Sequence, residues 1–375
     1  AKQLALGLNS MPADFVNAYV LGSVGSTGSI TGACASFLYN LQKACDMISS
    51  GRARVAIVGS SEAPINQECI DGYAAMGALA TEAGLRQIDG QDNVDFRRAS
   101  RPFGQNCGFT LAESSQFVVL MDDELAMQLG ADIHAAVPDV FINADGFKKS
   151  ISAPGPGNYL CLAKAVASAV QLLGAEAVQK RSFVHAHGSS TPANRVTESE
   201  LLDRVAANFG ITDWPITAIK AYVGHSLASA SADQLIAALG SFKYQLIPGI
   251  KTIDAIADDV HQQRLSIATA DVERSAQPLE LCFINSKGFG GNNASAVLLA
   301  PQVAERMLRK RYGAERFARY LGQREQTRAA AHAYDQQALL GQLQIIYNFG
   351  QDQIDDQGIQ MDAEQIRVPG FKQPL

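Results

Sequence analysis

Short, continuous apolar runs alternate with amphipathic, helix-favouring segments over the first 300 residues. Runs rich in β-branched and aromatic residues occupy 55–58, 117–121, 182–185, 216–219, 282–284 and 296–299. Such runs are typical of buried strands. The last two are joined by the Gly-rich turn FGGNN and are expected to pair. Continuous apolar strands between amphipathic helices predict an α/β protein whose sheets are covered on both faces.

The pattern changes after Pro301. The segment that follows is charged, rich in Arg and Gln, and favours helix. We therefore expect a core over residues 1–300 and a partly helical extension over 301–375, packed on the core or on a partner chain.

Composition excludes several classes of protein. The chain has 375 residues, 47% hydrophobic and 18% charged, as a globular protein with a substantial core does. Its net charge of −6 gives no indication of nucleic-acid binding. The six cysteines are scattered without a CxxC pair, which indicates neither a zinc knuckle nor a redox dithiol and fits a reducing compartment. No apolar run is long enough to span a bilayer and the amino terminus lacks a signal-peptide pattern, so we expect a cytoplasmic protein.

Cys34 lies in the small-residue stretch TGACAS, directly before a helix-like segment. A thiol at the start of a helix feels the positive end of the helix dipole, which favours the thiolate. Small neighbours also let a substrate reach the sulfur. A catalytic nucleophile and a buried, inert cysteine are both compatible with this stretch alone.

Two histidines lie in the stretch HAHGSST, at the end of a predicted strand. His185 and His187 are two residues apart, so they share one side of a strand and form a candidate metal pair, but no third ligand is near. His187 precedes Gly and two hydroxyl residues in a loop suited to a polar substrate chain. A structural histidine is the alternative.

Two further stretches carry candidate chemistry. KAYVGHSLASAS contains Lys220 and His225, a weak signal by itself. NSKGFGGNN is either a tight connection or a turn whose backbone N–H groups stabilise an oxyanion, with Phe289 free to swing over the site. It is not a phosphate loop, because no GKS or GKT follows.

The order of these motifs is more specific than any one of them. Cys, then HGSST, then K-x-x-x-GH, then GFGG-x-N resembles the β-ketoacyl synthase family over about residues 11–300. VAIVGSSEA, ASRPFGQNCGF and ISAPGPGNYLCLAKAVASAV also resemble family landmarks, in the expected order.

This resemblance implies a thiolase-like, five-layered α/β/α/β/α fold and a homodimer. It implies that Cys34 takes an acyl chain as a thioester, and that His187 and His225 promote decarboxylation of malonyl-carrier. Lys220 would be the structural and electrostatic lysine behind the histidines. Amides of Cys34 and Phe289 would form the oxyanion hole, with the Phe289 side chain as a gate.

The implied partners are an acyl carrier protein with its phosphopantetheine arm, malonyl-carrier, and an acyl-CoA or acyl-carrier donor. Ser189 and Thr191 would hydrogen-bond the pantetheine arm. Loss of carbon dioxide drives the condensation, so no metal, nucleotide or redox cofactor is expected.

The chain departs from the family pattern at four positions. Arg195 stands where an acid is usual, Lys287 where Phe is usual, Gln234 where Glu is common and Ala221 where Ser is frequent. We expect Lys287 to pair with a carboxylate or to face solvent, because an unpaired buried charge is costly. These departures indicate a divergent subgroup and favour short primers or an unusual acyl donor.

Only 33 residues precede Cys34, where the family has a long stretch. We therefore expect the first half of the fold to be incomplete in this chain, with unpaired strand edges and exposed apolar helix faces. Two other functions stay open. A CoA-dependent thiolase would need a second cysteine near the last Gly-rich loop, where only Cys282 is close. An inactive partner subunit would lack the nucleophile.

Overall fold

The computed structural model describes residues 7–23, 25–146, 155–343 and 354–371. The chain divides into two compact units, Ile30–Ala331 and a smaller one made of Ala1–Ser29 and His332–Leu375. The described elements that lie wholly in the smaller unit are α2 (Met11–Val16), the π-helix η1 (Asn17–Leu21), the 3-10 turn η4 (Asp356–Gly358) and the hairpin of β11 (Gln360–Met361) with β12 (Ile366–Arg367). The predicted division at residue 300 is a different one and stays a prediction.

The larger unit alternates strands with helices. Its helices are α3 (Ser36–Ser49), α4 (Gln67–Ala75), α5 (Glu82–Asp89), α6 (Asp123–Gln128), α7 (Pro156–Leu173), α8 (Ala175–Arg181), α9 (Pro192–Asn208), α10 (Lys220–Val223) and α11 (Ala230–Tyr244), with the 3-10 turns η2 (Phe96–Arg98) and η3 (Leu227–Ser229). Its strands are β1 (Val55–Glu62), β2 (Ser114–Met121), β3 (Val140–Ala144), β4 (Ser182–His185), β5 (Trp214–Thr217), β6 (Leu246–Ile247), β7 (Leu265–Ile267), β8 (Val272–Glu273), β9 (Leu281–Gly288) and β10 (Asn292–Leu299).

A six-stranded mixed sheet forms the centre of this unit, in the order β3-β10-β9-β4-β5-β7. β3, β10 and β9 are antiparallel neighbours, whereas β9, β4, β5 and β7 run parallel. Parallel strands need crossover connections, which α9 provides between β4 and β5. The carboxyl ends of β4 and β9 therefore meet at one edge, where the His187 and Phe289 loops begin.

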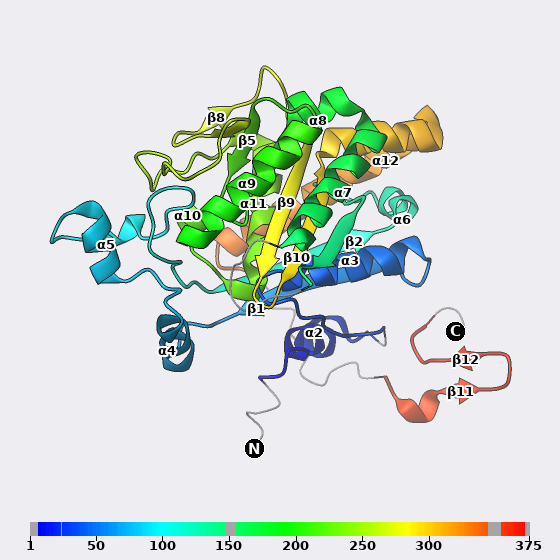
Figure 1. Ribbon diagram of the computed structural model, residues 1–375. Helices are drawn as coiled ribbons and strands as arrows, with labels where there is room; N and C mark the ends of the chain where they lie inside the picture. The colour runs from blue at the N-terminus through cyan, green and yellow to red at the C-terminus, as the bar shows by residue number, and fades with distance from the viewer. Residues whose placement is uncertain (1–6, 24, 147–154, 344–353, 372–375) are drawn as a thin grey trace. The chain divides into compact units, whose positions relative to one another are not determined.

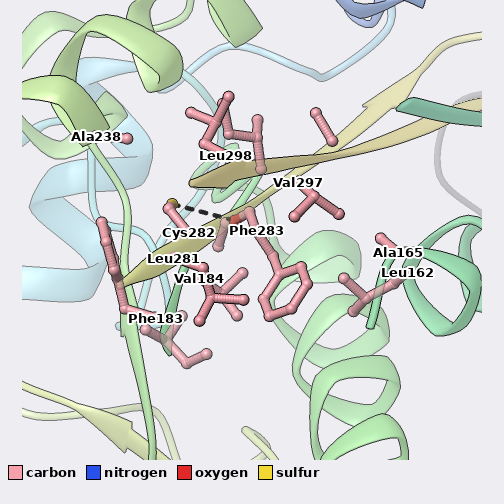
Figure 2. Close-up of a cluster of buried hydrophobic side chains, with 14 of the residues drawn as sticks. Leu162, Ala165, Phe183, Val184, Ala238, Leu281, Cys282, Phe283, Val297 and Leu298 are labelled. Atoms are coloured by element: carbon pink, nitrogen blue, oxygen red, sulfur yellow. Dashed lines mark hydrogen bonds between the residues drawn. The ribbon is translucent and has the colours of Figure 1, made fainter. Parts of the chain in front are cut away.

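Both faces of this sheet are covered, as the continuous apolar pattern predicts. Figure 2 shows Phe283 and Val297 turned towards Leu162 and Ala165 of α7, whereas Cys282 faces the opposite side, towards α11. α7 and α9 lie over one face, and α11 and α3 over the other (Figure 1). Residues 283 and 297 are fully buried, so this is the main hydrophobic core.

α3 and α11 also contact the antiparallel pair β1-β2, so these helices form a layer between two sheets. The described residues thus contain four of the five layers of the expected thiolase-like architecture. The second sheet corrects one expectation. It is not buried on both faces, because Val55 and Ile57 of β1 and Phe117 and Val119 of β2 are exposed.

Most predicted strands form, with altered ends. The run 182–185 coincides with β4. The run 216–219 was placed two residues too late, because Ile219 already has helical backbone angles as the residue preceding α10. β9 extends past its apolar run to Gly288 because the polar start of β10 pairs with it there.

The long helix α12 (Pro301–Leu339) follows β10 and breaks at Gly313, where φ is 80°. Its Phe317 and Tyr320 pack on Met127 of α6, and the Tyr320 hydroxyl donates to the Ala131 carbonyl. Ion pairs with acidic partners at the same surface flank this contact. They are Arg311–Asp123, Arg316–Glu124 and Arg328–Asp132. The first part of the predicted extension therefore packs on the body of the chain.

Among the described residues, no single helix is long and apolar enough to cross a membrane. The pair α7 and α8, bent by 115°, meets the length and composition limits only when its two helices are taken together.

Candidate active site

Cys34 lies at a tight turn before α3. Ala33 has a left-handed φ of 49°, unusual for a residue with a side chain, and the Ser36 hydroxyl braces the turn from inside. This hydroxyl accepts from the Gly32 N–H (2.9 Å) and donates to the Ala33 carbonyl (2.7 Å). Gly288, at the end of β9, packs so closely that a Cβ there would lie 2.2 Å from the Gly32 carbonyl oxygen. The turn and the end of β9 therefore position the thiol.

The Cys34 thiol is buried, which overturns the expectation of a thiolate. Burial raises its pKa from 9.0 to about 11, although the Lys220 charge and the backbone N–H groups of Phe289 and of Cys34 itself act in the opposite direction. Desolvation thus outweighs the helix dipole. The same two N–H groups are positioned beside the sulfur.

The loop after β4 carries His187 and is held by a buried carboxylate. Glu198 of α9 accepts hydrogen bonds from the backbone N–H of His187 (2.7 Å) and of Gly188 (2.8 Å). It also accepts from the side-chain amides of Asn194 (2.9 Å) and Asn285 (2.7 Å). Four donors compensate the buried charge and fix the start of the loop.

Lys220 lies behind this loop. Its Nζ donates to the His187 carbonyl at 2.5 Å, and its side chain is fully buried. Burial lowers its pKa from 10.5 to about 8, while the charge of Glu198 acts in the opposite direction. Lys220 thus ties the start of α10 to the His187 loop.

His187 and His225 face each other, with ring centroids 5.4 Å apart at an angle of 85°. The Nδ1 of His187 accepts from the backbone N–H of Lys287 (3.4 Å), and the Nδ1 of His225 accepts from that of Leu227 (3.2 Å). An accepting Nδ1 leaves the proton of a neutral ring on Nε2. Burial lowers the pKa of His225 well below 6.5, so this ring is neutral. The pair can present two Nε2–H donors.

Phe289 begins an aromatic chain that ends at the histidines. Its ring centroid is 6.2 Å from that of Tyr73, which is 5.3 Å from that of Phe109. Phe109 in turn lies 5.1 Å from the ring of His225. The histidines, the Phe289 turn and the thiol thus belong to one site.

Ser189 and Thr191 follow His187 in the same loop. Their hydroxyl oxygens are 3.1 Å apart, and Thr191 immediately precedes α9 without capping it through its side chain. Ser189 is buried, whereas Thr191 is partly exposed. Together they form a small polar pair at the mouth of the loop.

Three of the departures from the family pattern are built into the core. Arg195 forms a two-pronged ion pair with Asp259 (2.7 and 2.8 Å) and also donates to Asn106 (3.1 Å). Lys287 is buried, and its Nζ donates to the Thr197 hydroxyl (3.2 Å), so it does not face solvent.

The third departure, Gln234, ties two strands together. Its Nε2 lies within hydrogen-bond distance of the carbonyls of His185 (2.9 Å), Ala186 (2.7 Å) and Asn285 (3.0 Å). An amide donor suits this position, because a carboxylate would face carbonyl oxygens there. The fourth departure, Ala221, is buried in α10 beside Lys220.

Two alternatives lose support. In the part of the chain that the structure describes, no group of three or more His, Cys, Asp or Glu could hold a metal ion, and the ring nitrogens of His185 have no hydrogen-bond partner. Cys282, the candidate second thiolase cysteine, is fully buried against α11 (Figure 2), and burial raises its pKa far above the usual range.

The sequence did not identify Glu198, Tyr73 or Phe109 as parts of the site. For Glu198 a signal existed, because it lies at helical spacing from the buried Leu201 and Val205 of α9. Tyr73 and Phe109 carried no local signal, since aromatic residues in α/β proteins are usually core.

Two family models match the chain. Residues 5–126 match the β-ketoacyl synthase N-terminal domain, and residues 134–254 match the C-terminal domain of the same family. The β-ketoacyl-[acyl-carrier-protein] synthase FabY of Pseudomonas aeruginosa is 76% identical over all 375 residues, which are 59% of its length. The 3-oxoacyl-[acyl-carrier-protein] synthase 2 of Vibrio cholerae is 28% identical over 278 residues, 74% of this chain and 63% of that one.

Solved structures agree. The crystal structure of the P. aeruginosa ketosynthase FabY has a TM-score of 0.98 and 75% identity, over the whole of this chain and 58% of that one. A type II polyketide ketosynthase in complex with its acyl carrier protein has a TM-score of 0.68 at 24% identity, over 80% of this chain and 68% of that one, and shares the fold. The chain thus spans about three-fifths of the curated relatives it matches. Its motifs, fold and relatives agree, and the chain belongs to the β-ketoacyl synthase family.

Proposed function

We propose that this chain carries the condensing site of a β-ketoacyl-acyl-carrier-protein synthase acting in fatty-acid or polyketide synthesis. One observation carries the proposal: a thiol flanked by two backbone N–H groups lies in one site with two histidines whose Nδ1 atoms are already occupied. That arrangement supplies a nucleophile, an oxyanion hole and two further donors, as decarboxylative condensation requires. The names of the relatives, both acyl-carrier-protein synthases, point to the same reaction.

In the first step, the Cys34 sulfur attacks an acyl thioester, and the amides of Cys34 and Phe289 stabilise the oxyanion that forms. The carrier thiol or CoA leaves with the proton that Cys34 gives up. Since burial raises the thiol pKa to about 11, little thiolate is present at rest, and attack requires the loss of this proton.

In the second step, malonyl-carrier loses carbon dioxide. The Nε2–H groups of His187 and His225 donate to its thioester carbonyl, where the enolate charge develops. Neutral imidazole rings suit this task, because stabilising the enolate oxygen needs a hydrogen-bond donor and does not need a positively charged ring. Lys220 acts through His187, by holding the carbonyl of that residue.

In the third step, the enolate carbon attacks the acyl group on Cys34, forming the β-ketoacyl thioester. The Cys34 thiolate leaves and takes up a proton, which restores the thiol. Phe289 would act as the gate between the acyl and malonyl sides, and Ser189 with Thr191 would bind the pantetheine arm. These roles rest on position in the site and on the family pattern.

We further propose that the partners are an acyl carrier protein and a second copy of the protein, as in the family. The six free cysteines of the chain support a reducing compartment and hence the cytoplasm.

The experiment separates the two half-reactions. Cys34→Ala should abolish condensation yet still release carbon dioxide from malonyl-carrier, because decarboxylation uses the histidines. His225→Ala should lose both, while its Cys34 still accepts an acyl group. Loss of decarboxylation in Cys34→Ala equal to that in His225→Ala, with both variants folded, would refute this division of roles.

An inactive partner subunit is the competing function. It predicts that Cys34 accepts no acyl group from any donor, and the same assay would detect this.

A further inference from the structure

Tyr73 joins the two sides of the proposed site. Its ring, on α4, lies between that of Phe289, whose N–H is beside the Cys34 sulfur, and that of Phe109, which packs on His225. The proposed mechanism gives Tyr73 no task. Its place is nevertheless next to the point where an acyl group on Cys34 would begin.

The backbone holds Tyr73 in this position. The Tyr73 carbonyl accepts from the Ala78 N–H (3.0 Å), and the Ala78 carbonyl accepts from the Phe109 N–H (2.9 Å). At Gly108 a Cβ would lie 2.2 Å from the carbonyl carbon of Leu79, so only glycine permits this close approach. The contact between Tyr73 and Phe109 is thus fixed by the fold.

The Tyr73 hydroxyl is the polar part of an otherwise aromatic wall. Within the described residues it has no hydrogen-bond partner, and the residue is half-buried. Burial raises the pKa of the phenol to about 12, and the Cys34 charge acts in the same direction. The hydroxyl is therefore protonated at working pH and needs water or substrate as its partner.

We propose that Tyr73 is a specificity-determining residue that selects short acyl groups on Cys34. An acyl group whose carbonyl is held by the amides of Cys34 and Phe289 extends beside the Phe289 and Tyr73 rings. A short group leaves the Tyr73 hydroxyl in contact with water. A long alkyl chain displaces that water and offers no acceptor, so the hydroxyl is left unpaired.

This inference rests on the proposed function and specifies its acyl donor. The expected discrimination is about tenfold, since leaving a buried hydroxyl unpaired typically changes an equilibrium or rate by roughly that factor or more. A phenylalanine at the same position keeps the ring contacts and removes only the hydroxyl.

The test measures acylation alone. The full-length protein is incubated with acetyl-CoA or dodecanoyl-CoA, and the rate of adduct formation on Cys34 is followed by mass spectrometry. In Tyr73→Phe the dodecanoyl rate should rise about tenfold relative to the acetyl rate. Tyr73→Leu should shift the ratio in the same direction. The control Tyr244→Phe, at a tyrosine 67% exposed, should leave it unchanged.

An unchanged ratio in Tyr73→Phe, or a change confined to the acetyl rate, would overturn the inference while Cys34 still acylates. A wild-type preference for the dodecanoyl donor would overturn it as well. If wild-type Cys34 accepts neither group, the proposed function itself fails and this inference with it.

Discussion

The burial of Cys34 has a direct consequence for its reactivity. Only the thiolate is nucleophilic, and a pKa of about 11 leaves about one thiol in ten thousand ionised at pH 7. We expect the rate of Cys34 alkylation by iodoacetamide to rise about tenfold per pH unit from pH 7 to 10, measured on its peptide by mass spectrometry. Lys220→Ala should slow it most near pH 7, because the lysine, whose pKa is about 8, carries there the charge that lowers the thiol pKa.

A plateau below pH 9 would show that the thiolate is already favoured at rest. It would also revive the helix-dipole argument that the sequence supported. Local features of the TGACAS stretch favour a thiolate, but they do not show that the end of β9, far away in the chain, packs against this turn.

Glu198 is the second residue whose effect can be isolated. Glu198→Gln removes the charge and turns an amide towards four N–H donors. We expect a loss of about 3 kcal/mol in the free energy of unfolding, measured in urea, because hydrogen bonds to a buried charge are strong.

Glu200→Gln, on the same helix, is the matched control. Its ion pair with Arg204 is largely exposed, so the change should stay within about 0.5 kcal/mol. Equal effects of the two variants would contradict the role assigned to Glu198.

For helices and strands, the sequence predicted which segments form strands better than it predicted how far each strand is buried. The apolar run 182–185 sufficed for β4, because all its residues are buried. The run 117–121 was equally apolar, yet Phe117 and Val119 face outwards in β2. An apolar residue in a strand indicates a place in a sheet, and the layers that cover the sheet decide its burial.

The candidate site was likewise only partly predictable from the sequence. The order of the motifs identified four candidate residues, and the structure places them in one site. They are Cys34, His187, His225 and Phe289. Contacts between distant elements could not be derived from the local sequence pattern. Examples are the hydrogen bonds from the Gln234 side chain to the carbonyls of His185 and Asn285.

The packing of β9 on the turn that carries Cys34 is testable through Gly288. Gly288→Ala would put a Cβ 2.2 Å from the Gly32 carbonyl oxygen and 3.1 Å from the Cys34 nitrogen. Since backbone must move to relieve this clash, we expect a loss of about 2 kcal/mol of stability and at least about a hundredfold slower Cys34 acylation.

The control for this change is Gly240→Ala in α11, where a Cβ would meet nothing within 4 Å. It should raise stability by up to about 1 kcal/mol, because alanine favours helix, and leave acylation unchanged. Normal acylation in folded Gly288→Ala would refute the packing argument.

For the molecule as a whole, the outward face of the β1-β2 sheet stands out because large apolar side chains are exposed on it. Val55, Ile57, Phe117 and Val119 line it, and the phenyl ring of Phe117 lies across Gly59. Exposed apolar strand faces promote association. We expect the 375-residue chain alone to self-associate with rising concentration in sedimentation velocity, and the double change Ile57→Thr, Val119→Thr to suppress this.

Ser115→Thr, on the same face, is the control and should leave association unchanged. The face would lose this role if the double variant and the wild type sedimented alike at every concentration.

A pulse and chase on the thiol tests directly whether Cys34 carries the acyl group that is condensed. The protein is loaded with isotopically labelled acyl-CoA, freed of excess donor, and then given malonyl-carrier. We expect label first on Cys34 alone, then its complete transfer to a β-ketoacyl-carrier as carbon dioxide is released. Product that carries the label without passing through Cys34, or a labelled Cys34 that malonyl-carrier cannot discharge, would contradict it.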